Sequence, residues 1–481
     1  MEKIKLVNYG DIPDKISVKN SVIHEIKEGL GFNWFSCYQE DTYPAPEDEK
    51  RWNSIFKHAE WLNIKFLRFG QFSKCMCDSK GNFMPGDQSF KQLKRVNRWC
   101  EEKDATIIID PWSVPNNFQF EPWEGAPRPW GNPNSNYSLG VKDIDGYVTK
   151  FIVPYVKYVV EEMNCKAVKW FNHINEPLLG GYSATPEGID NHARYVEVLA
   201  AIRQGLNEAG LAHIGNMGPD THTHMYWPIP KMLENGADPD PFIQAYCMHH
   251  YHSRFDWALP GKNLTSDLMS VTINEQLAKY CSYVHDHNKP YFVTEVGMFY
   301  YGWSNGDPAG IRRHDNVLLE TEFIVRALRE GTDGVLRWGW LNPGTSDGMW
   351  QLLETCDGSD VPVIDPYKGY GTLMRFIGRN AKVLDTDVQY ANDSSKTVHA
   401  VAVLNKDGSR SLFIVNDHYS ECARVTINLS GWNATSVRKI INDSTRKYYE
   451  CNDINISAED TEYEDVLTPM SLTVYTTMLE V

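Results

Sequence analysis

Two glutamates each stand in or directly after a run of apolar and aromatic residues, and both could carry acid–base chemistry. Glu176 ends the run in residues 170–177 (W-F-N-H-I-N-E-P), and Glu295 lies in residues 291–297 (Y-F-V-T-E-V-G). Runs of this kind favour buried strands, so each carboxyl group is expected at the C-terminal mouth of a strand. Two carboxyl groups that face one another supply an acid and a nucleophile or base.

The chemistry that needs such a pair is the cleavage of a glycosidic bond. Retaining cleavage uses one carboxylic acid to protonate the leaving oxygen and one carboxylate, about 5 to 5.5 Å away, to attack the anomeric carbon. Either glutamate alone is also explained as a surface acid after a strand. The two together, on opposite sides of one barrel mouth, favour the catalytic interpretation.

The elements that must position these glutamates alternate between short apolar runs and amphipathic helical runs from residue 29 to about residue 380. Strands are predicted at residues 31–37, 64–70, 105–110, 212–219, 243–252 and 334–342 and around both glutamates, and helices at residues 48–63, 90–103, 148–164, 190–209, 272–287 and 315–330. Parallel strands need helical crossovers, and eight of them close into a barrel. The predicted fold class is therefore α/β, with a (β/α)8 TIM barrel over residues 29–381.

A second domain is predicted where the helical period disappears, over residues 382–481. Two strand-like runs, residues 397–404 and 411–416, flank Lys406-Asp407-Gly408, which is a strong hairpin signal. We read this region as a C-terminal β-sandwich. Residues 1–28 hold further strand-like runs that lead into no helix, and we expect them to pack on the sandwich.

The composition limits the partners. The net charge of −16 argues against nucleic acid or an anionic membrane surface as a partner, because both require a positive face. No run of about 18 apolar residues is present, and the first residues do not resemble a signal peptide, so a cytoplasmic location is expected unless a leader has been removed. The 15 tryptophans suit either stacking on sugar rings or ordinary core filling. No cofactor is implied, and Cys75 and Cys77 are too few for a metal site.

The motifs around the glutamates resemble those of clan A glycoside hydrolases, the superfamily that includes families 5 and 39. Asn175-Glu176-Pro177 matches the strand-four motif of that clan, and residues 294–297 (T-E-V-G) match its strand-seven motif. The resemblance covers roughly residues 29–380. It implies that Glu176 is the acid/base, that Asn175 holds the sugar 2-hydroxyl, and that Glu295 is the nucleophile.

Further positions match the clan residue by residue. Arg68 resembles the arginine that donates to the nucleophile, although it could also belong to a surface ion pair. His249 and Tyr251 resemble the clan's His-x-Tyr pair, in which the tyrosine hydroxyl touches the nucleophile. The run reads H-H-Y-H, so His250 or His252 could be the pocket histidine instead. A metal-ligand role for these histidines is not expected, because no acidic or cysteine cluster stands beside them in the sequence.

The remaining candidates are aromatic and polar residues at or beyond strand ends. Trp338 resembles the tryptophan that forms the floor under the sugar, and Trp340, two residues later, could take that place; both could instead pack inside the barrel. Residues that could supply sugar contacts are Asn33, Trp34, Trp112, Asn172, His173, Asp220 and His222.

These observations predict a retaining β-glycosidase that acts on oligosaccharides or small glycosides by double displacement. We expect an exo-acting enzyme of the β-xylosidase or β-glucosidase kind, because the long segment 115–138 could close one end of the cleft and family 39-like enzymes also carry a sandwich. An endo-acting β-glucanase or mannanase of the family 5 type is the alternative. A catalytically inactive carbohydrate-binding protein on a hydrolase scaffold is the alternative from another class. Sugar identity and oligomeric state are not predicted.

Overall fold

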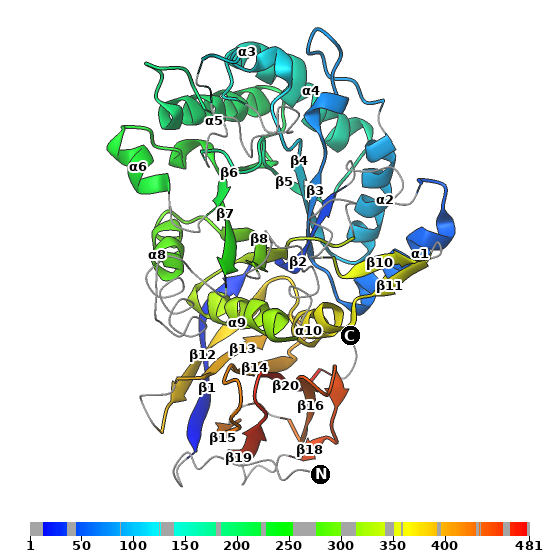
Figure 1. Ribbon diagram of the computed structural model, residues 1–481, viewed down its shortest axis with the longest axis vertical. Helices are drawn as coiled ribbons and strands as arrows, with labels where there is room; N and C mark the ends of the chain where they lie inside the picture. The colour runs from blue at the N-terminus through cyan, green and yellow to red at the C-terminus, as the bar shows by residue number, and fades with distance from the viewer. Residues whose placement is uncertain are drawn as a thin grey trace.

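The structure is a computed structural model in which a barrel, ringed by helices, stands on a β-sheet domain (Figure 1). The residues that it describes are 13–35, 45–86, 88–124, 126, 139–178, 184–222, 228–253, 276–299, 314–341, 351–356, 359–391, 396–429, 432, 434–455 and 462–478. Among the helices of these residues, none is long and apolar enough to cross a membrane.

Eight parallel strands close the barrel. They are β2 (Gly29–Phe35), β3 (Phe66–Gly70), β4 (Thr106–Asp110), β5 (Val168–Phe171), β6 (Gly215–His222), β7 (Ala245–Ser253), β8 (Tyr291–Phe299) and β9 (Gly334–Arg337). The strands pair in chain order and β9 returns to β2, where Gly29 pairs with Gly334. The predicted (β/α)8 barrel is confirmed, and parallel closure brings every strand's C-terminal end to one mouth.

Helices cover the outside of the barrel. They are α1 (Glu49–Trp61), α2 (Gln88–Glu102), α3 (Ile144–Gly146), α4 (Val153–Lys157), α5 (Asn191–Glu208), α6 (Pro228–Glu234), α8 (Ala278–Asp286), α9 (His314–Glu330) and α10 (Ile364–Met374). Helix α1 begins where the Asp48 carboxylate accepts from the Arg51 amide at 3.1 Å, which satisfies one of the amides that the first turn leaves without a partner. The helix predicted at residues 148–164 is instead a series of α and π turns, with Pro154 in α4. Proline lacks the amide hydrogen that a regular α-helix needs at this position.

The β-sheet domain is one curled sheet in which the order is β17-β16-β20-β14-β13-β12-β1-β15-β19. Its strands are β1 (Asp14–Ile26), β12 (Ala381–Gln389), β13 (Val398–Leu404), β14 (Arg410–Asn416), β15 (Ala423–Asn428), β16 (Ser436–Asn442), β17 (Tyr449–Glu450), β18 (Ile454–Asn455), β19 (Glu462–Leu467) and β20 (Ser471–Thr476). The hairpin predicted around Gly408 joins β13 to β14. Strand β1 pairs with β12 and β15, so a strand from the N-terminal segment lies within the C-terminal sheet. The division of the chain at residues 28 and 381 stays a prediction.

Helices α9 and α10 form the layer between the barrel and this sheet (Figure 1). Helix α9 is buried on every side from His314 to Leu328 except at Asp315, because it packs on β8 on one side and on β13 and β14 on the other. On its barrel side, Glu320 accepts from the Arg337 guanidinium at 2.7 Å and from the Tyr370 hydroxyl at 2.9 Å. A buried ion pair needs such additional hydrogen bonds to offset its desolvation. A different set of charged residues lies on the sheet side of α9.

Candidate active site

The C-terminal mouth of the barrel gathers the polar residues that sequence analysis placed at strand ends. Each barrel strand alternates its side chains between the barrel interior and the helix layer. Strand β8 has a register irregularity after Val293, and there the consecutive residues Thr294 and Glu295 both reach the mouth. The side chains that meet there are Asn33 of β2, Arg68 of β3, Asp110 of β4, Asn172, Asn175 and Glu176 after β5, Asp220 of β6, His249 and Tyr251 of β7, and Thr294 and Glu295 of β8.

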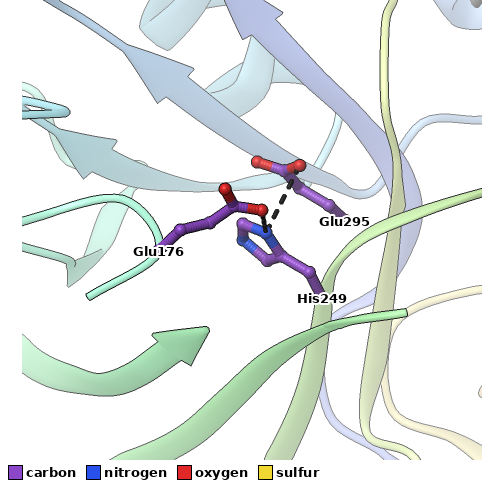
Figure 2. A group of neighbouring side chains, drawn as sticks. All are labelled: Glu176, His249 and Glu295. Carbon is purple, nitrogen blue, oxygen red and sulfur yellow. Dashed lines mark hydrogen bonds and ion pairs between the residues drawn. The ribbon is translucent and has the colours of Figure 1, made fainter. Parts of the chain in front are cut away.

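Glu176 and Glu295 face each other with His249 beside both (Figure 2). One oxygen of each carboxylate and one nitrogen of the imidazole all lie within 4.8 Å of one another. The His249 Nδ1 atom is 2.9 Å from Glu176 Oε1 and 3.4 Å from Glu295 Oε2. Glu176 also has a backbone φ of +46°, in the left-handed region that non-glycine residues rarely adopt, which is a strained conformation typical of functional sites.

Glu295 is held by two donors. The Arg68 Nη1 atom donates to Glu295 Oε1 at 2.6 Å, and the Tyr251 hydroxyl donates to Glu295 Oε2 at 2.6 Å. Burial raises the pKa of Glu295 to about 7, although the positive charges of His249 and Arg68 oppose that rise. Both oxygens are therefore fixed in position while the carboxylate stays within reach of protonation near neutral pH.

Arg68 is the centre of a buried charge network. Besides Glu295, its guanidinium donates to Asp110 at 2.8 Å, to Asp220 at 2.7 Å and to the Asn175 side-chain oxygen at 2.7 Å. Burial alone would lower the pKa of Arg68, but the three carboxylates together raise it above its ordinary value. Arg68 therefore remains charged and ties four strand ends to one point.

Asp220 supports the site instead of offering a sugar contact. It is fully buried, and its carboxylate accepts from Arg68, from the Asn172 amide at 2.7 Å and from the Thr294 hydroxyl. Burial would raise the pKa of Asp220, but Arg68 and His249 hold it well below its ordinary value. Sequence analysis missed Asp110 and Thr294 as supports, although Asp110 ends a fully buried strand and follows three isoleucines, a signal like the one that identified Glu176.

Of the two histidines of the H-H-Y-H run whose side chains are described, His249 lies in the pocket. His249 and Tyr251 point to the mouth, while His250 points to the helix layer, where its Nε2 atom lies 2.8 Å from the Tyr291 hydroxyl and its ring 5.3 Å from that of Phe323. Burial would lower the pKa of His249, but Glu295 and Asp220 raise it to about 10. The ring is therefore protonated, so it donates to Glu176. The His252 side chain lies outside the described residues.

Two tryptophans form an aromatic wall at the mouth. The rings of Trp112 and Trp338 stack with centroids 5.7 Å apart, and the Arg68 guanidinium lies 4.8 Å from the Trp112 ring. An aromatic face beside paired carboxylates suits the apolar face of a sugar ring. The platform role of Trp338 stays a prediction.

Three residues expected to contact the sugar face the helix layer instead. Trp34 stacks on Trp52 of α1 at 5.7 Å, because it is the outward neighbour of Asn33 on β2. Trp340 packs on Phe32 at 5.3 Å, because Gly339, with a φ of +88°, turns the chain and ends the strand alternation that would have aligned Trp340 with Trp338. These two expectations are corrected.

His173 is the third of these residues. It stacks on Tyr195 of α5 at 5.4 Å and is 1% exposed. Burial lowers the pKa of His173 to about 3, so the ring is neutral and belongs to the packing between β5 and α5. The chain leaves the strand conformation after Phe171, so an extended-strand pattern could not predict its direction. The side chain of His222, another candidate, lies outside the described residues.

The acidic pair does not suit a metal ion. Glu176, His249 and Glu295 are close enough to ligate one, but both oxygens of Glu295 already accept hydrogen bonds, from Arg68 and from Tyr251. Arg68 already supplies a positive charge to Glu295. The arrangement suits proton transfer and attack by a carboxylate on a neutral substrate.

Comparisons with known proteins agree with this geometry. The family model described as Cellulase (glycosyl hydrolase family 5) matches residues 28–342. Among solved structures, the fold is similar to a GH30 endoxylanase from Clostridium papyrosolvens C71 (TM-score 0.64, 15% identity, 96% of this chain and 99% of that one). It is also similar to a glucosidase from Croceicoccus marinus (TM-score 0.64, 13% identity, 97% and 99%) and to an endo-β-1,6-glucanase (TM-score 0.62, 14% identity, 96% and 94%).

Comparison with curated protein sequences gives no match. The solved structures share the fold at low identity, whereas the family model covers the whole barrel, including both glutamates and the residues that hold them. The chain therefore belongs to glycosyl hydrolase family 5 and is a retaining glycoside hydrolase of clan A.

Proposed function

We propose that this enzyme hydrolyses β-glycosidic bonds by double displacement, with Glu295 as nucleophile and Glu176 as acid/base. The observation that carries the proposal is the approach of the two carboxylates to within 4.8 Å at the barrel mouth. Retaining enzymes keep their carboxyl groups about 5 to 5.5 Å apart, whereas inverting enzymes leave room for a water at about 6.5 to 9.5 Å.

The two steps follow from these positions. In the first, protonated Glu176 gives its proton to the leaving oxygen while Glu295 attacks the anomeric carbon, so the glycosidic bond breaks and a glycosyl ester forms. In the second, ionised Glu176 takes a proton from a water molecule, the water attacks the same carbon, and Glu295 leaves as the carboxylate. The sugar product is released with its original anomeric configuration.

The neighbouring residues support these roles. Arg68 and Tyr251 orient the Glu295 oxygens and stabilise its charge when the glycosyl ester breaks. The Asn175 side-chain oxygen accepts from Arg68, which leaves the amide nitrogen to donate to the sugar 2-hydroxyl, as the clan resemblance implies. His249 holds Glu176 Oε1 and fixes the direction of the acid.

An endo-acting β-glucanase or xylanase is the mode of action that we favour. The matched family is described as a cellulase, and two of the three similar structures named above carry endo-acting enzymes in their descriptions. The exo-acting alternative has support from the glucosidase of similar TM-score. Residues 115–138 would close the cleft in an exo-acting enzyme. Of this segment, residue 125 and residues 127–138 lie outside the described residues.

A substrate series tests this mode of action. The enzyme would be incubated with aryl β-glucosides and β-xylosides and with gluco- and xylo-oligosaccharides of two to six units, and the products separated by length. We expect internal cleavage of the longer oligosaccharides and little turnover of the aryl β-glucosides and β-xylosides. Release of single sugars from one chain end would support the exo-acting alternative, and binding without turnover of any member would favour a carbohydrate-binding protein.

Replacing Tyr251 with phenylalanine tests the proposed nucleophile through pH. The Tyr251 hydroxyl stabilises the charged carboxylate of Glu295, so its loss raises the pKa of Glu295. A hydrogen bond to a charged group contributes about 1.5 to 3 kcal/mol, which corresponds to a shift of at least about one pH unit. Because the nucleophile must be ionised, the acidic limb of kcat/KM against pH should move to higher pH by about that amount.

The matched control is Tyr283→Phe, which removes a hydroxyl from α8 and should leave the pH profile unchanged. If Tyr251→Phe folds and its acidic limb of kcat/KM stays at the wild-type pH, the ionisation of Glu295 does not determine that limb.

A further inference from the structure

A second group of ionisable side chains lies away from the barrel mouth, where the barrel meets the β-sheet domain. It consists of Glu322 on the sheet side of α9, His399 on β13, and Asp417 directly after β14, and we call it the junction cluster. One ligand-type atom from each of the three residues lies within 4.8 Å of the others. The cluster therefore joins three segments from both domains at one point.

Both carboxyl groups of the junction cluster lie near the imidazole of His399. Its Nε2 atom lies 3.5 Å from Glu322 Oε1 and 3.6 Å from Asp417 Oδ2, both beyond ordinary hydrogen-bond length. Glu322 Oε2, His399 Nε2 and Asp417 Oδ2 are buried atoms without a hydrogen-bond partner among the described residues. The His399 Nε2 and Asp417 Oδ2 atoms are therefore buried 3.6 Å apart without a hydrogen bond, next to Glu322 Oε1, and this is a costly arrangement unless something binds between them.

The junction cluster holds two carboxyl groups, and the cationic or titratable groups that act on it are Arg326, Arg329 and His418. Arg326, one turn along α9, donates to Glu322 Oε1 at 2.9 Å, which occupies one carboxylate oxygen and offsets one of the two negative charges. Burial raises the pKa of Asp417 to about 7, and burial together with Asp417 raises that of Glu322. Burial lowers the pKa of His399 to about 4, against the opposing effect of Glu322.

We propose that the junction cluster is a site for a divalent transition-metal ion of the zinc type, held by Glu322, His399 and Asp417. Zinc binds imidazole nitrogen and carboxylate oxygen at about 2.0 to 2.2 Å, and tetrahedral ligation at those lengths separates ligand atoms by roughly 3.4 Å. The separations of 3.5 and 3.6 Å around His399 Nε2 are close to that value. Calcium and magnesium take oxygen ligands almost exclusively, so the imidazole at the centre disfavours them.

The ion would act as a structural link between the two domains. Glu322 belongs to the helix that also carries Glu320 on the barrel side, while His399 and Asp417 belong to the β-sheet domain. Binding of an ion to the folded chain alone stabilises the folded state by mass action. The site is distinct from the catalytic pair, whose protonated His249 and Arg68 oppose a cation.

Zinc binding by the full chain tests the proposal. Chelator-treated protein would be titrated with ZnCl2, with stoichiometry from calorimetry and metal analysis and Tm from thermal unfolding. One zinc per chain and a higher Tm are expected for the wild type. In His399→Gln the affinity should fall by about tenfold or more, since even the loss of an outer-shell partner costs about that much. His213→Gln, which removes an exposed histidine, should behave like the wild type.

Two results would overturn the proposal. One is no zinc binding by the wild type. The other is equal binding by the wild type and His399→Gln, which is expected if zinc binds only at the catalytic carboxylates. If His399→Gln does not fold, as judged by circular dichroism, the nearly isosteric Asp417→Asn decides in its place. Asp417→Asn removes one charged ligand and should likewise weaken binding, and unchanged affinity in this variant would also contradict the site.

Discussion

Glu295→Ala is expected to abolish turnover while the chain still folds. Removal of a catalytic nucleophile costs roughly 10⁴- to 10⁶-fold in kcat, because no other group can form the covalent intermediate. The variant leaves Arg68 and Tyr251 without their carboxylate partner, so Tm should be compared with that of the wild type. Hydrolysis of an activated aryl glycoside would be measured by release of the aryl group.

Azide should rescue this variant. A small anion can enter the space left by the side chain and attack the anomeric carbon on the face that Glu295 used, which gives a glycosyl azide of inverted configuration. Glu162→Ala, which removes an exposed glutamate, is the control and should need no rescue. A glycosyl azide with the configuration of the substrate would exclude Glu295 as the nucleophile.

Glu176→Ala is expected to separate substrates by their leaving groups. Sugar leaving groups need protonation, so their hydrolysis should fall by roughly 10²- to 10⁴-fold, the usual contribution of general acid catalysis. Aryl leaving groups of low pKa depart without a proton, so their first step should change little. Rates for a series of aryl glycosides, plotted against leaving-group pKa, measure the difference.

The control for Glu176→Ala is His249→Asn, which removes the donor to Glu176 but leaves the acid itself. It should give a smaller and less leaving-group-dependent loss. Equal losses for good and poor leaving groups in Glu176→Ala would remove Glu176 from the acid role and reassign it to substrate binding or to structure.

The barrel and the two glutamates could be predicted from the sequence for a physical reason. A buried parallel strand is a largely apolar run, so a carboxyl group within it or soon after it stands out: Glu295 lies within β8, and Glu176 lies five residues after β5. The regular alternation along β7 likewise assigns His249 and Tyr251 to one side and His250 to the other, once the side that faces the mouth is known.

The directions of side chains beyond strand ends were not predictable in this way. Trp340 follows the left-handed Gly339, and His173 follows the last paired residue of β5, so neither continues the period of two on which the expectation rested. The expectation that Trp34 contacts the sugar was wrong for a different reason. An aromatic residue suits a sugar platform and a helix interface equally well. Only the position of Asn33 inside the barrel shows that its neighbour Trp34 faces the helix layer.

Residues that are far apart in the sequence and close together only in the folded chain were the hardest to predict. Asp220 is a single aspartate on β6 whose four polar neighbours come from other strands and loops. The junction cluster draws Glu322 from helix α9, His399 from strand β13, and Asp417 from the position directly after β14. No local spacing connects such residues, because only the packing of α9 on the sheet brings them together.

The anomeric configuration of the first product tests the central claim most directly. Wild-type enzyme would be mixed with its best β-linked substrate from the series above, and the anomeric protons followed by NMR before mutarotation. Early appearance of the β-anomer is the result predicted by two carboxylates within 4.8 Å, acting in two displacements. Early appearance of the α-anomer would mean a single displacement by water, and would contradict the roles assigned to Glu176 and Glu295.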